Sequence, residues 1–267
     1  MRMGVIGCGA MGSAFVKGSS KGNQWLLFDK NPHKAKGLAS LVQGQVMEDV
    51  ERLIRRADVI LLAIKPKDFK VFAENVRHQN FKGKIIVSLM TGASVARCRQ
   101  VFIGADIVRL MPSLSVTCKL GVIAVVEDKK MQKQTKEWTE HFLSPLGNVI
   151  WMQEDKIDAF IAVSASGIGF IFALMQALYE GSLELGFDAQ NSRQLIIDTI
   201  EGAMALARHS SNSFKQLKEQ VASPGGTTEA GLNVMQKENI AQALISTLHA
   251  CHERSVQITR EIERGFS

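Results

Sequence analysis

Short apolar runs alternate with amphipathic stretches through the first half of the chain. The strand-like runs are Met3–Ile6, Trp25–Phe28, Val59–Ile64, Ile85–Leu89, Ile107–Leu110, Val122–Val126 and Val149–Met152. Polar and apolar residues recur with helical spacing at 31–41, 49–56, 68–77 and 130–143. This alternation predicts a parallel sheet covered by helices.

The pattern changes near residue 154, after which only helical periodicity remains. The predicted helices are Asp158–Leu185, Ser192–Arg208, Phe214–Ala222 and Glu229–Arg264. The apolar residues of the last one recur every three or four positions. We therefore predict an α/β domain over residues 1–153 and an all-helical domain over 154–267.

One segment is long enough to cross a bilayer, because residues 159–179 carry no charged side chain. Serine, glycine and glutamine residues interrupt its apolar character, and no basic flank precedes it. A helix that is apolar on every face also occurs at the centre of a bundle, packed by neighbours all round. We expect that bundle position and no membrane partner.

The formal net charge of +6 raises the question of a nucleic-acid partner. The basic residues are scattered and form neither a stripe nor a known motif, so no nucleic-acid partner is expected. The four cysteines, at 8, 98, 118 and 251, lack the spacing of a metal site or a disulfide framework, so no metal is expected. The sequence enters a structural motif at once, without a signal peptide, which favours a cytoplasmic location.

A glycine-rich turn follows the first predicted strand in the pattern Gly7-x-Gly9-x-x-Gly12 and opens a helix. That context is typical of a Rossmann-type dinucleotide-binding domain. The first glycine permits the tight turn, the second lets the backbone approach a pyrophosphate, and the third lets the helix pack on the strand. The predicted phosphate-binding residues are Gly7, Cys8, Gly9, Ala10, Met11 and Gly12.

Asp29 ends the second predicted strand, where an acidic side chain binds the adenosine ribose in such domains. A carboxylate there accepts from a 2′-hydroxyl and repels a 2′-phosphate, which favours NAD. Lys30, His33, Lys34 and Lys36 follow and could neutralise a 2′-phosphate. We expect Asp29 and Lys30 to contact the cofactor, and the choice between NADP and NAD stays open.

Further motifs resemble those of one enzyme family. Three follow predicted strands, where ligands bind in such sheets: "AIKPKD" (63–68), "SLMTGAS" (88–94) and "RLMPS" (109–113). Together with "SASGIGFIF" (164–172), "SPGGTTEAGL" (223–232) and "HERS" (252–255), they resemble pyrroline-5-carboxylate reductase nearly end to end. The Ser-Pro-Gly-Gly-x-Thr block is the most specific of these motifs.

The resemblance implies an oxidoreductase that reduces 1-pyrroline-5-carboxylate, a cyclic imino acid, to L-proline with hydride from NADPH or NADH, the last step of proline biosynthesis. It also implies a Rossmann domain followed by a helical domain that interlocks with a second subunit in a homodimer, and dimers that assemble into decamers. The further cofactor contacts that it implies are Ala63, Lys65, Pro66, Gly92, Met111 and Pro112.

The loop "SPGGTT" suits a small carboxylate on physical grounds. Pro224 stops the preceding helix, and Gly225 and Gly226 can take positive φ, which turns successive N–H groups into one concavity. Thr227 and Thr228 then stand at a helix start. By the resemblance, Ser166, Gly225, Gly226, Thr227 and Thr228 bind the substrate, and Thr228 is the catalytic candidate that orients the imine nitrogen.

The sequence also departs from the family pattern. Ser113-Leu114-Ser115 stands where Asn-Thr-Pro is usual, and Ser164-Ala165-Ser166-Gly167 replaces Ser-Gly-Ser-Gly. Two alternatives therefore stay open. One is a β-hydroxyacid-type dehydrogenase, although such an enzyme needs a lysine that the stretch from 158 to 180 lacks. The other is a non-catalytic NAD(P)-binding paralogue.

Overall fold

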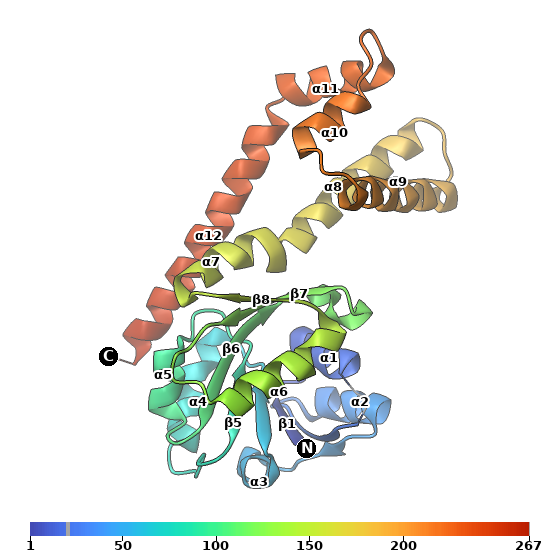
Figure 1. The fold of residues 1–267 in the computed structure, drawn as a ribbon. Helices are drawn as coiled ribbons and strands as arrows, with labels where there is room; N and C mark the ends of the chain where they lie inside the picture. The colour runs from blue at the N-terminus through green and yellow to red at the C-terminus, as the bar shows by residue number, and fades with distance from the viewer. Residues whose placement is uncertain (20–21, 267) are drawn as a thin grey trace. The chain divides into compact units, whose positions relative to one another are not determined.

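The computed structural model describes residues 1–19 and 22–266, which contain one eight-stranded sheet in the order β3-β2-β1-β4-β5-β6-β7-β8 (Figure 1). The strands are β1 Arg2–Ile6, β2 Gln24–Phe28, β3 Gln45–Val46, β4 Val59–Leu62, β5 Ile85–Ser88, β6 Asp106–Pro112, β7 Gly121–Val126 and β8 Gly147–Met152. All seven predicted strands are present. β3 was not predicted, because two residues are too few to show a period of two.

The sheet is parallel except where β7 runs antiparallel to β6. Only residues 113–120 connect these two strands, which is too short for the crossover that a parallel pair requires. The prediction of a wholly parallel sheet is therefore wrong at this pair. Ser113 supports the short connection, since its Oγ accepts from Val122 N at 2.9 Å and lies 2.8 Å from Ser115 Oγ.

Both faces of the sheet are covered, as the near-continuous apolar strands require. Apolar side chains of α1 (Ala10–Gly18), α2 (Pro32–Val42) and α6 (Lys133–Leu143) fill the core on one face. Those of α3 (Val50–Arg56), α4 (Phe69–Val76) and α5 (Val95–Val101) fill the core on the other. The result is a Rossmann-type α/β domain.

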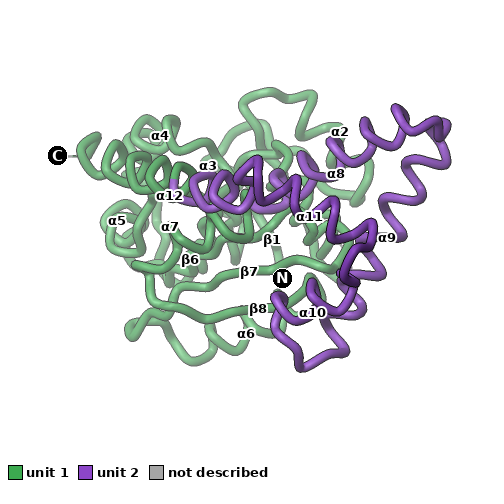
Figure 2. The backbone as a smooth tube through the Cα atoms, turned by 90° about the horizontal axis from the view of Figure 1, so that it is seen from above, with its two compact units in different colours: residues 1–166, 250–267 green, residues 167–249 purple. Residues whose placement is uncertain are grey.

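The chain divides into two compact units, residues 1–166 with 250–267 and residues 167–249 (Figure 2). The first unit includes α7 (Ile157–Phe160) and the end of α12 (Ile240–Gly265), which pack on the sheet through Ile157 and Ile262. Asp158 Oδ1 accepts from Ser255 Oγ at 2.5 Å and so joins α7 to α12. The domain boundary at residue 153 stays a prediction, because compactness divides the chain differently.

The second unit consists of α8 (Gly167–Glu184), α9 (Ala189–His209), α10 (Phe214–Gln220), α11 (Thr227–Lys237) and the start of α12. The prediction of one helix from Glu229 to Arg264 is wrong, because the helix breaks at Asn239. This residue has φ 53°, a left-handed conformation that asparagine tolerates better than most residues.

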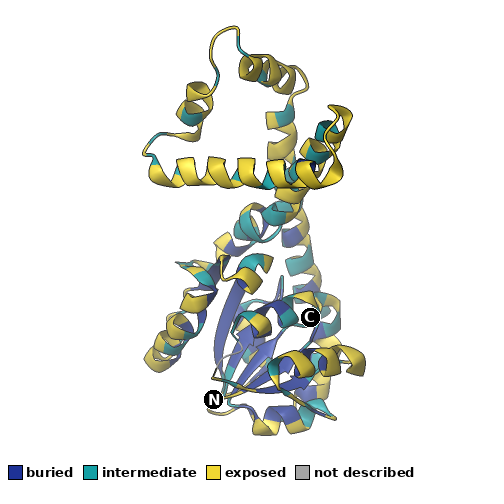
Figure 3. Cartoon of the chain, turned by 90° about the vertical axis from the view of Figure 1, so that its right-hand side faces the viewer, coloured by how far each residue is buried: buried dark blue, intermediate teal, exposed yellow. Residues whose placement is uncertain are grey.

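No described residue of α8 is buried, and exposed residues dominate the second unit (Figure 3). The neighbours expected to pack all round this helix are therefore not supplied by the described residues of one chain. The stretch Glu154–Glu184 is apolar and long enough to cross a membrane by length and composition alone. Apolar surface of this extent in a helical unit also marks an interface with another protein chain.

A buried ion pair fastens the sheet to the start of the helical half. Arg109 of β6 is 4% exposed, and its Nη1 lies 2.6 Å from Glu154 Oε1, which also accepts from Val95 N at 2.8 Å. The Arg109 Nε has no partner among the described residues. The ion pair thus depends on the contact of one guanidinium nitrogen, Nη1, with Glu154 Oε1.

We predict that Glu154→Ala lowers the free energy of unfolding by about 3 kcal/mol, because it leaves a buried guanidinium unpaired. Arg109→Met should cost less, because the Glu154 side chain is 35% exposed and water can solvate its carboxylate. Urea unfolding at one fixed protein concentration measures both values. An equal or larger loss in Arg109→Met would contradict the prediction.

Candidate cofactor and substrate sites

The glycine-rich turn joins β1 to α1, and its glycines serve different needs. Gly7 has φ +102°, and a Cβ on Gly12 would lie 2.1 Å from Gly7 O, so the chain's own packing requires both glycines. A Cβ on Gly9 would meet nothing within 4 Å. The open space beside Gly9 lets a ligand approach the backbone, as the pyrophosphate of a dinucleotide does in this fold.

A cavity of about 450 Å³ lies at the carboxyl ends of β1, β2 and β4. Its lining residues are Ile6, Gly7, Gly9, Phe28, Asp29, Lys30, Lys34, Ala63, Ile64, Lys65, Asp68, Val71, Phe72 and Asn75. Six of the predicted cofactor residues therefore line the same cavity: Gly7, Gly9, Asp29, Lys30, Ala63 and Lys65. Cys8, Ala10, Met11, Gly12 and Pro66 adjoin these residues in sequence and do not line the cavity.

One side of the cavity was not predicted. Asp68 is the N-cap of α4, and Val71, Phe72 and Asn75 follow it along the helix at three- and four-residue spacing, which places them on one helix face. Val71 is 60% exposed although it is apolar. The sequence offers only helical spacing after the "KPKD" motif as a signal for this side, and any amphipathic helix shows the same spacing.

Asp29 stabilises the glycine-rich turn through hydrogen bonds from backbone amides. Its Oδ2 accepts from Cys8 N at 2.7 Å, and its Oδ1 accepts from Asn31 N at 2.8 Å. Burial, with a smaller contribution from the Asp29 charge, raises the pKa of the Cys8 thiol to about 12. The thiol therefore stays neutral near pH 7 and adds no negative charge to the turn.

The three remaining predicted cofactor residues are distant in sequence from every residue that lines this cavity. Gly92 has φ +82°, and a Cβ there would come within 3.0 Å of Thr259 Cα, so its conformation accommodates α12. Met111 and Pro112 are buried in β6. Their contact with the nicotinamide stays a prediction.

The loop between α10 and α11 turns sharply at two glycines. Gly226 N donates to Ser223 O at 2.9 Å, and Gly225 has φ +71°, as a turn with proline before glycine requires. A Cβ on Gly226 would lie 2.4 Å from Ser223 Oγ. Gly226 has φ −86°, so the expected positive φ is found at Gly225 and not at Gly226, where the lack of space for a Cβ favours glycine instead.

The turn leads directly into α11, which starts with Thr227 and Thr228. Gly225 N donates to Glu229 Oε2 at 2.7 Å, so this amide binds a carboxylate of its own chain. An amide at this position can thus hold a carboxylate oxygen, which is the chemistry that the sequence predicts for the loop.

Ser166, the remaining predicted substrate residue, is the last residue of the segment 1–166 in the first compact unit. Its N–H donates to Ile161 O at 2.8 Å and closes the π-helical turn Ile161–Ala165. Such turns occur often at functional sites. The loop around Gly225 belongs to the second unit, so the structure describes the two parts of the predicted substrate site separately.

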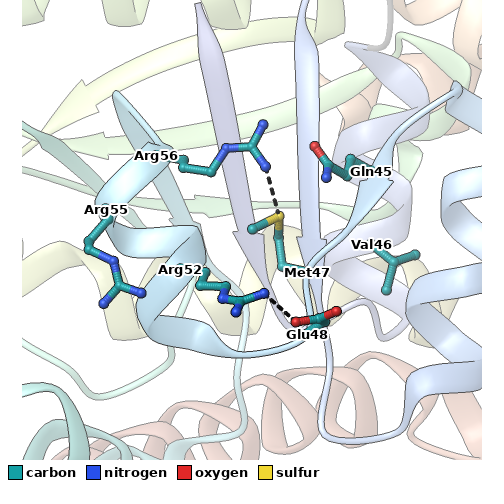
Figure 4. A pocket seen from close by; sticks show the side chains of 7 residues that line it. All are labelled: Gln45, Val46, Met47, Glu48, Arg52, Arg55 and Arg56. Carbon is teal, nitrogen blue, oxygen red and sulfur yellow. Dashed lines mark hydrogen bonds and ion pairs between the residues drawn. The ribbon is translucent and has the colours of Figure 1, made fainter.

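A second cavity, of about 200 Å³, lies between β3 and α3 and contains three arginines (Figure 4). Arg52 pairs with Glu48 and Asp49, Arg55 pairs with Glu51, and Arg56 Nη1 lies 3.9 Å from the Met47 sulfur. Acidic neighbours neutralise two of the three guanidinium groups, so this cavity offers an anion little net positive charge. The described residues contain no cluster of three His, Cys, Asp or Glu side chains able to hold a metal ion.

The sheet order, the glycine-rich turn and the cavity beside it define a dinucleotide-binding protein of the Rossmann class. Residues 2–92 match a family model described as NADP oxidoreductase coenzyme F420-dependent, and residues 154–258 match one described as pyrroline-5-carboxylate reductase dimerisation. The helical half by family model, and nearly the whole chain by its relatives, are thus similar to pyrroline-5-carboxylate reductases.

Relatives match over nearly the whole chain. Pyrroline-5-carboxylate reductase of Aquifex aeolicus is 29% identical, over 98% of this chain and 97% of that protein. The solved structure of the Coxiella burnetii pyrroline-5-carboxylate reductase is 27% identical, with a TM-score of 0.80 over 96% of this chain and 98% of that one. The Plasmodium falciparum pyrroline carboxylate reductase, solved with NADP bound, has a TM-score of 0.87 at 22% identity, over 97% of this chain and 98% of that one.

Proposed function

We propose that the protein reduces 1-pyrroline-5-carboxylate to L-proline with hydride from NADPH or NADH, the last step of proline biosynthesis. The observation that carries the proposal is the similarity to pyrroline-5-carboxylate reductases over 98% of the chain. It includes both halves that the reaction needs, a dinucleotide-binding domain and a helical domain with a carboxylate-binding loop.

The first compact unit would hold the cofactor. The open side of Gly9 and the first N–H groups of α1 face the position of a pyrophosphate, and Val71 and Phe72 offer apolar surface for the adenine. The nicotinamide supplies the hydride when it is bound. The chain's own contribution is to bind, orient and exclude water.

The Gly225–Gly226 turn would hold the substrate carboxylate, and Ser166 would complete the substrate site. The protonated imine is already an electrophile, so the protein needs no strong acid or base beside it. The Thr228 hydroxyl, at the second position of α11, would orient the imine nitrogen and relay its proton. Glu229 would give up its bond to Gly225 N or share that amide with the substrate.

The helical half would form the homodimer. It matches the dimerisation model of the family and exposes large apolar side chains along α8, including Ile171, Phe172 and Leu178. A partner helix that covers them would remove the apolar surface from water. We also propose that dimers assemble further, up to a decamer, and that the enzyme works in the cytoplasm.

The retained loop favours the imine reductase over the two alternatives. α8 contains no lysine to act as the acid–base group of a β-hydroxyacid-type dehydrogenase. A non-catalytic paralogue would not need the Gly225–Gly226 turn, whose Gly225 amide binds the carboxylate of Glu229. The serines at 113 and 115 support the β6–β7 connection, which gives these departures from the family pattern a structural role.

The decisive measurement is the oxidation of NADPH and NADH, followed at 1-pyrroline-5-carboxylate concentrations that saturate the enzyme. We expect turnover with the imine and none in reverse with 3-hydroxyacids and NADP or NAD. Cofactor binding without imine turnover would favour the non-catalytic paralogue. Oxidation of 3-hydroxyacids would favour the dehydrogenase.

A further inference from the structure

The cavity beside the glycine-rich turn is lined by charged side chains of both signs. Lys30, Lys34 and Lys65 bring three cations to its wall, and Asp29 and Asp68 bring two carboxylates. A dinucleotide bound in this fold places its adenosine ribose against the acidic residue that follows β2, which is Asp29 here. The 2′ position of that ribose is the only difference between NADH and NADPH.

The carboxylate of Asp29 cannot turn away from this position. Its two oxygens accept from the amides of Cys8 and Asn31, at 2.7 and 2.8 Å. Asp29 therefore presents a fixed negative charge near the ribose, which favours a 2′-hydroxyl and opposes a 2′-phosphate. Discrimination then depends on which cations are free to compensate.

Lys30, the cation next to Asp29 in the chain, is engaged elsewhere. Its Nζ lies 2.9 Å from Asp68 Oδ2, and the two side chains are 77% and 34% exposed. An ion pair so open to water is weak and exchanges readily for another partner. A phosphate monoester, with about two negative charges near neutral pH, is a stronger partner for an ammonium group than one carboxylate.

We propose that the Lys30–Asp68 ion pair sets the selectivity of this enzyme between NADPH and NADH. The 2′-phosphate of NADPH gains Lys30 by displacing Asp68, whereas NADH leaves the pair intact. Asp68 therefore competes with the 2′-phosphate and restrains the preference for NADPH. The inference rests on the proposed function for the identity of the cofactor, and it adds the residues that select it.

The test compares Asp68→Asn, Lys30→Gln and the double variant with the unchanged enzyme. Asparagine is as good as aspartate at the position before α4, and the Asp68 side chain makes no capping hydrogen bond there, so the helix start should be preserved. Lys67→Gln is the matched control, because Lys67 neighbours Asp68 in the chain and does not line the cavity. Two readouts are used. One is the Kd of each reduced cofactor from its fluorescence, and the other is kcat/KM of each cofactor when 1-pyrroline-5-carboxylate is reduced.

We measure the preference for NADPH as the NADPH-to-NADH ratio of 1/Kd and of kcat/KM. Asp68→Asn should raise this ratio about fivefold and Lys30→Gln should lower it by a similar factor, in keeping with the free energies of exposed ion pairs. In the Lys30→Gln background, Asp68→Asn should change the ratio by less than about twofold, because the competition for Lys30 is gone. Lys67→Gln should leave the ratio unchanged.

Equal effects of Asp68→Asn on both cofactors would overturn the proposal, as would a fivefold effect that persists without Lys30. The fluorescence titration needs no imine. If the Kd ratio shifts as expected but the imine is not reduced, the proposed function fails and the selectivity mechanism stands. If the imine is reduced and neither ratio shifts, the selectivity mechanism alone fails.

Discussion

Replacement of Gly12 by alanine should weaken the binding of NADPH and NADH by a factor of about 10 to 100, because the added methyl group forces the turn away from its native position. A Cβ at Gly12 would lie 2.1 Å from Gly7 O, which is backbone and cannot move by rotating a side chain. The same strain should lower the free energy of unfolding by about 1–3 kcal/mol.

The matched control is Gly37→Ala, since Gly37 also lies within a helix and a Cβ there meets nothing within 4 Å. Alanine should stabilise α2 by up to about 1 kcal/mol and leave cofactor binding unchanged. Fluorescence titration and urea unfolding measure both properties. Unchanged affinity in Gly12→Ala would mean that α1 does not determine the position of the glycine-rich turn.

The second large effect is expected for Thr228→Ala, which should lower kcat for imine reduction by about 100-fold if the hydroxyl orients the imine nitrogen and relays its proton. Cofactor affinity should change little, because Thr228 lies in the helical unit and the cofactor cavity lies in the other unit. Alanine is well tolerated inside a helix, so the start of α11 should remain intact.

Thr228→Ser keeps the hydroxyl and should restore most of the turnover, which separates its chemistry from the packing of its methyl group. Steady-state kinetics with each variant, together with cofactor titrations, give the comparison. An equal loss of kcat and of cofactor affinity in Thr228→Ala would show that its role is misplaced.

Local patterns predicted the sheet well, since apolar runs and glycine spacing report on a few neighbouring residues. The run from Val59 to Ile64 and the turn at Gly7 are found where they were expected. β3 escaped prediction because two residues carry no period. The break at Asn239 escaped because a single residue in the left-handed region leaves the apolar spacing on either side unchanged.

Features that depend on distant segments were harder to predict. The spacing of Val71, Phe72 and Asn75 is compatible with any amphipathic helix, and only the fold places them against the wall beside Gly9. The exposure of α8 within one chain could not be predicted from its residues either. An apolar helix must be covered, but its sequence does not show whether its own chain or a second subunit covers it. The substrate loop was predicted from residue chemistry. Gly225 has the predicted positive φ and Gly226 does not, while substrate binding by the loop and the role of Thr228 stay predictions.

The return of the C-terminal helix to the sheet affects how the protein is synthesised. Ile262 fills part of the same apolar core as Ile60 and Ile107, and it leaves the ribosome only after the helical stretch 157–261. The nascent α/β domain therefore waits with an incomplete interior while the whole helical half is translated. A chain cut short before this residue would keep its glycine-rich turn and lose part of the core behind it.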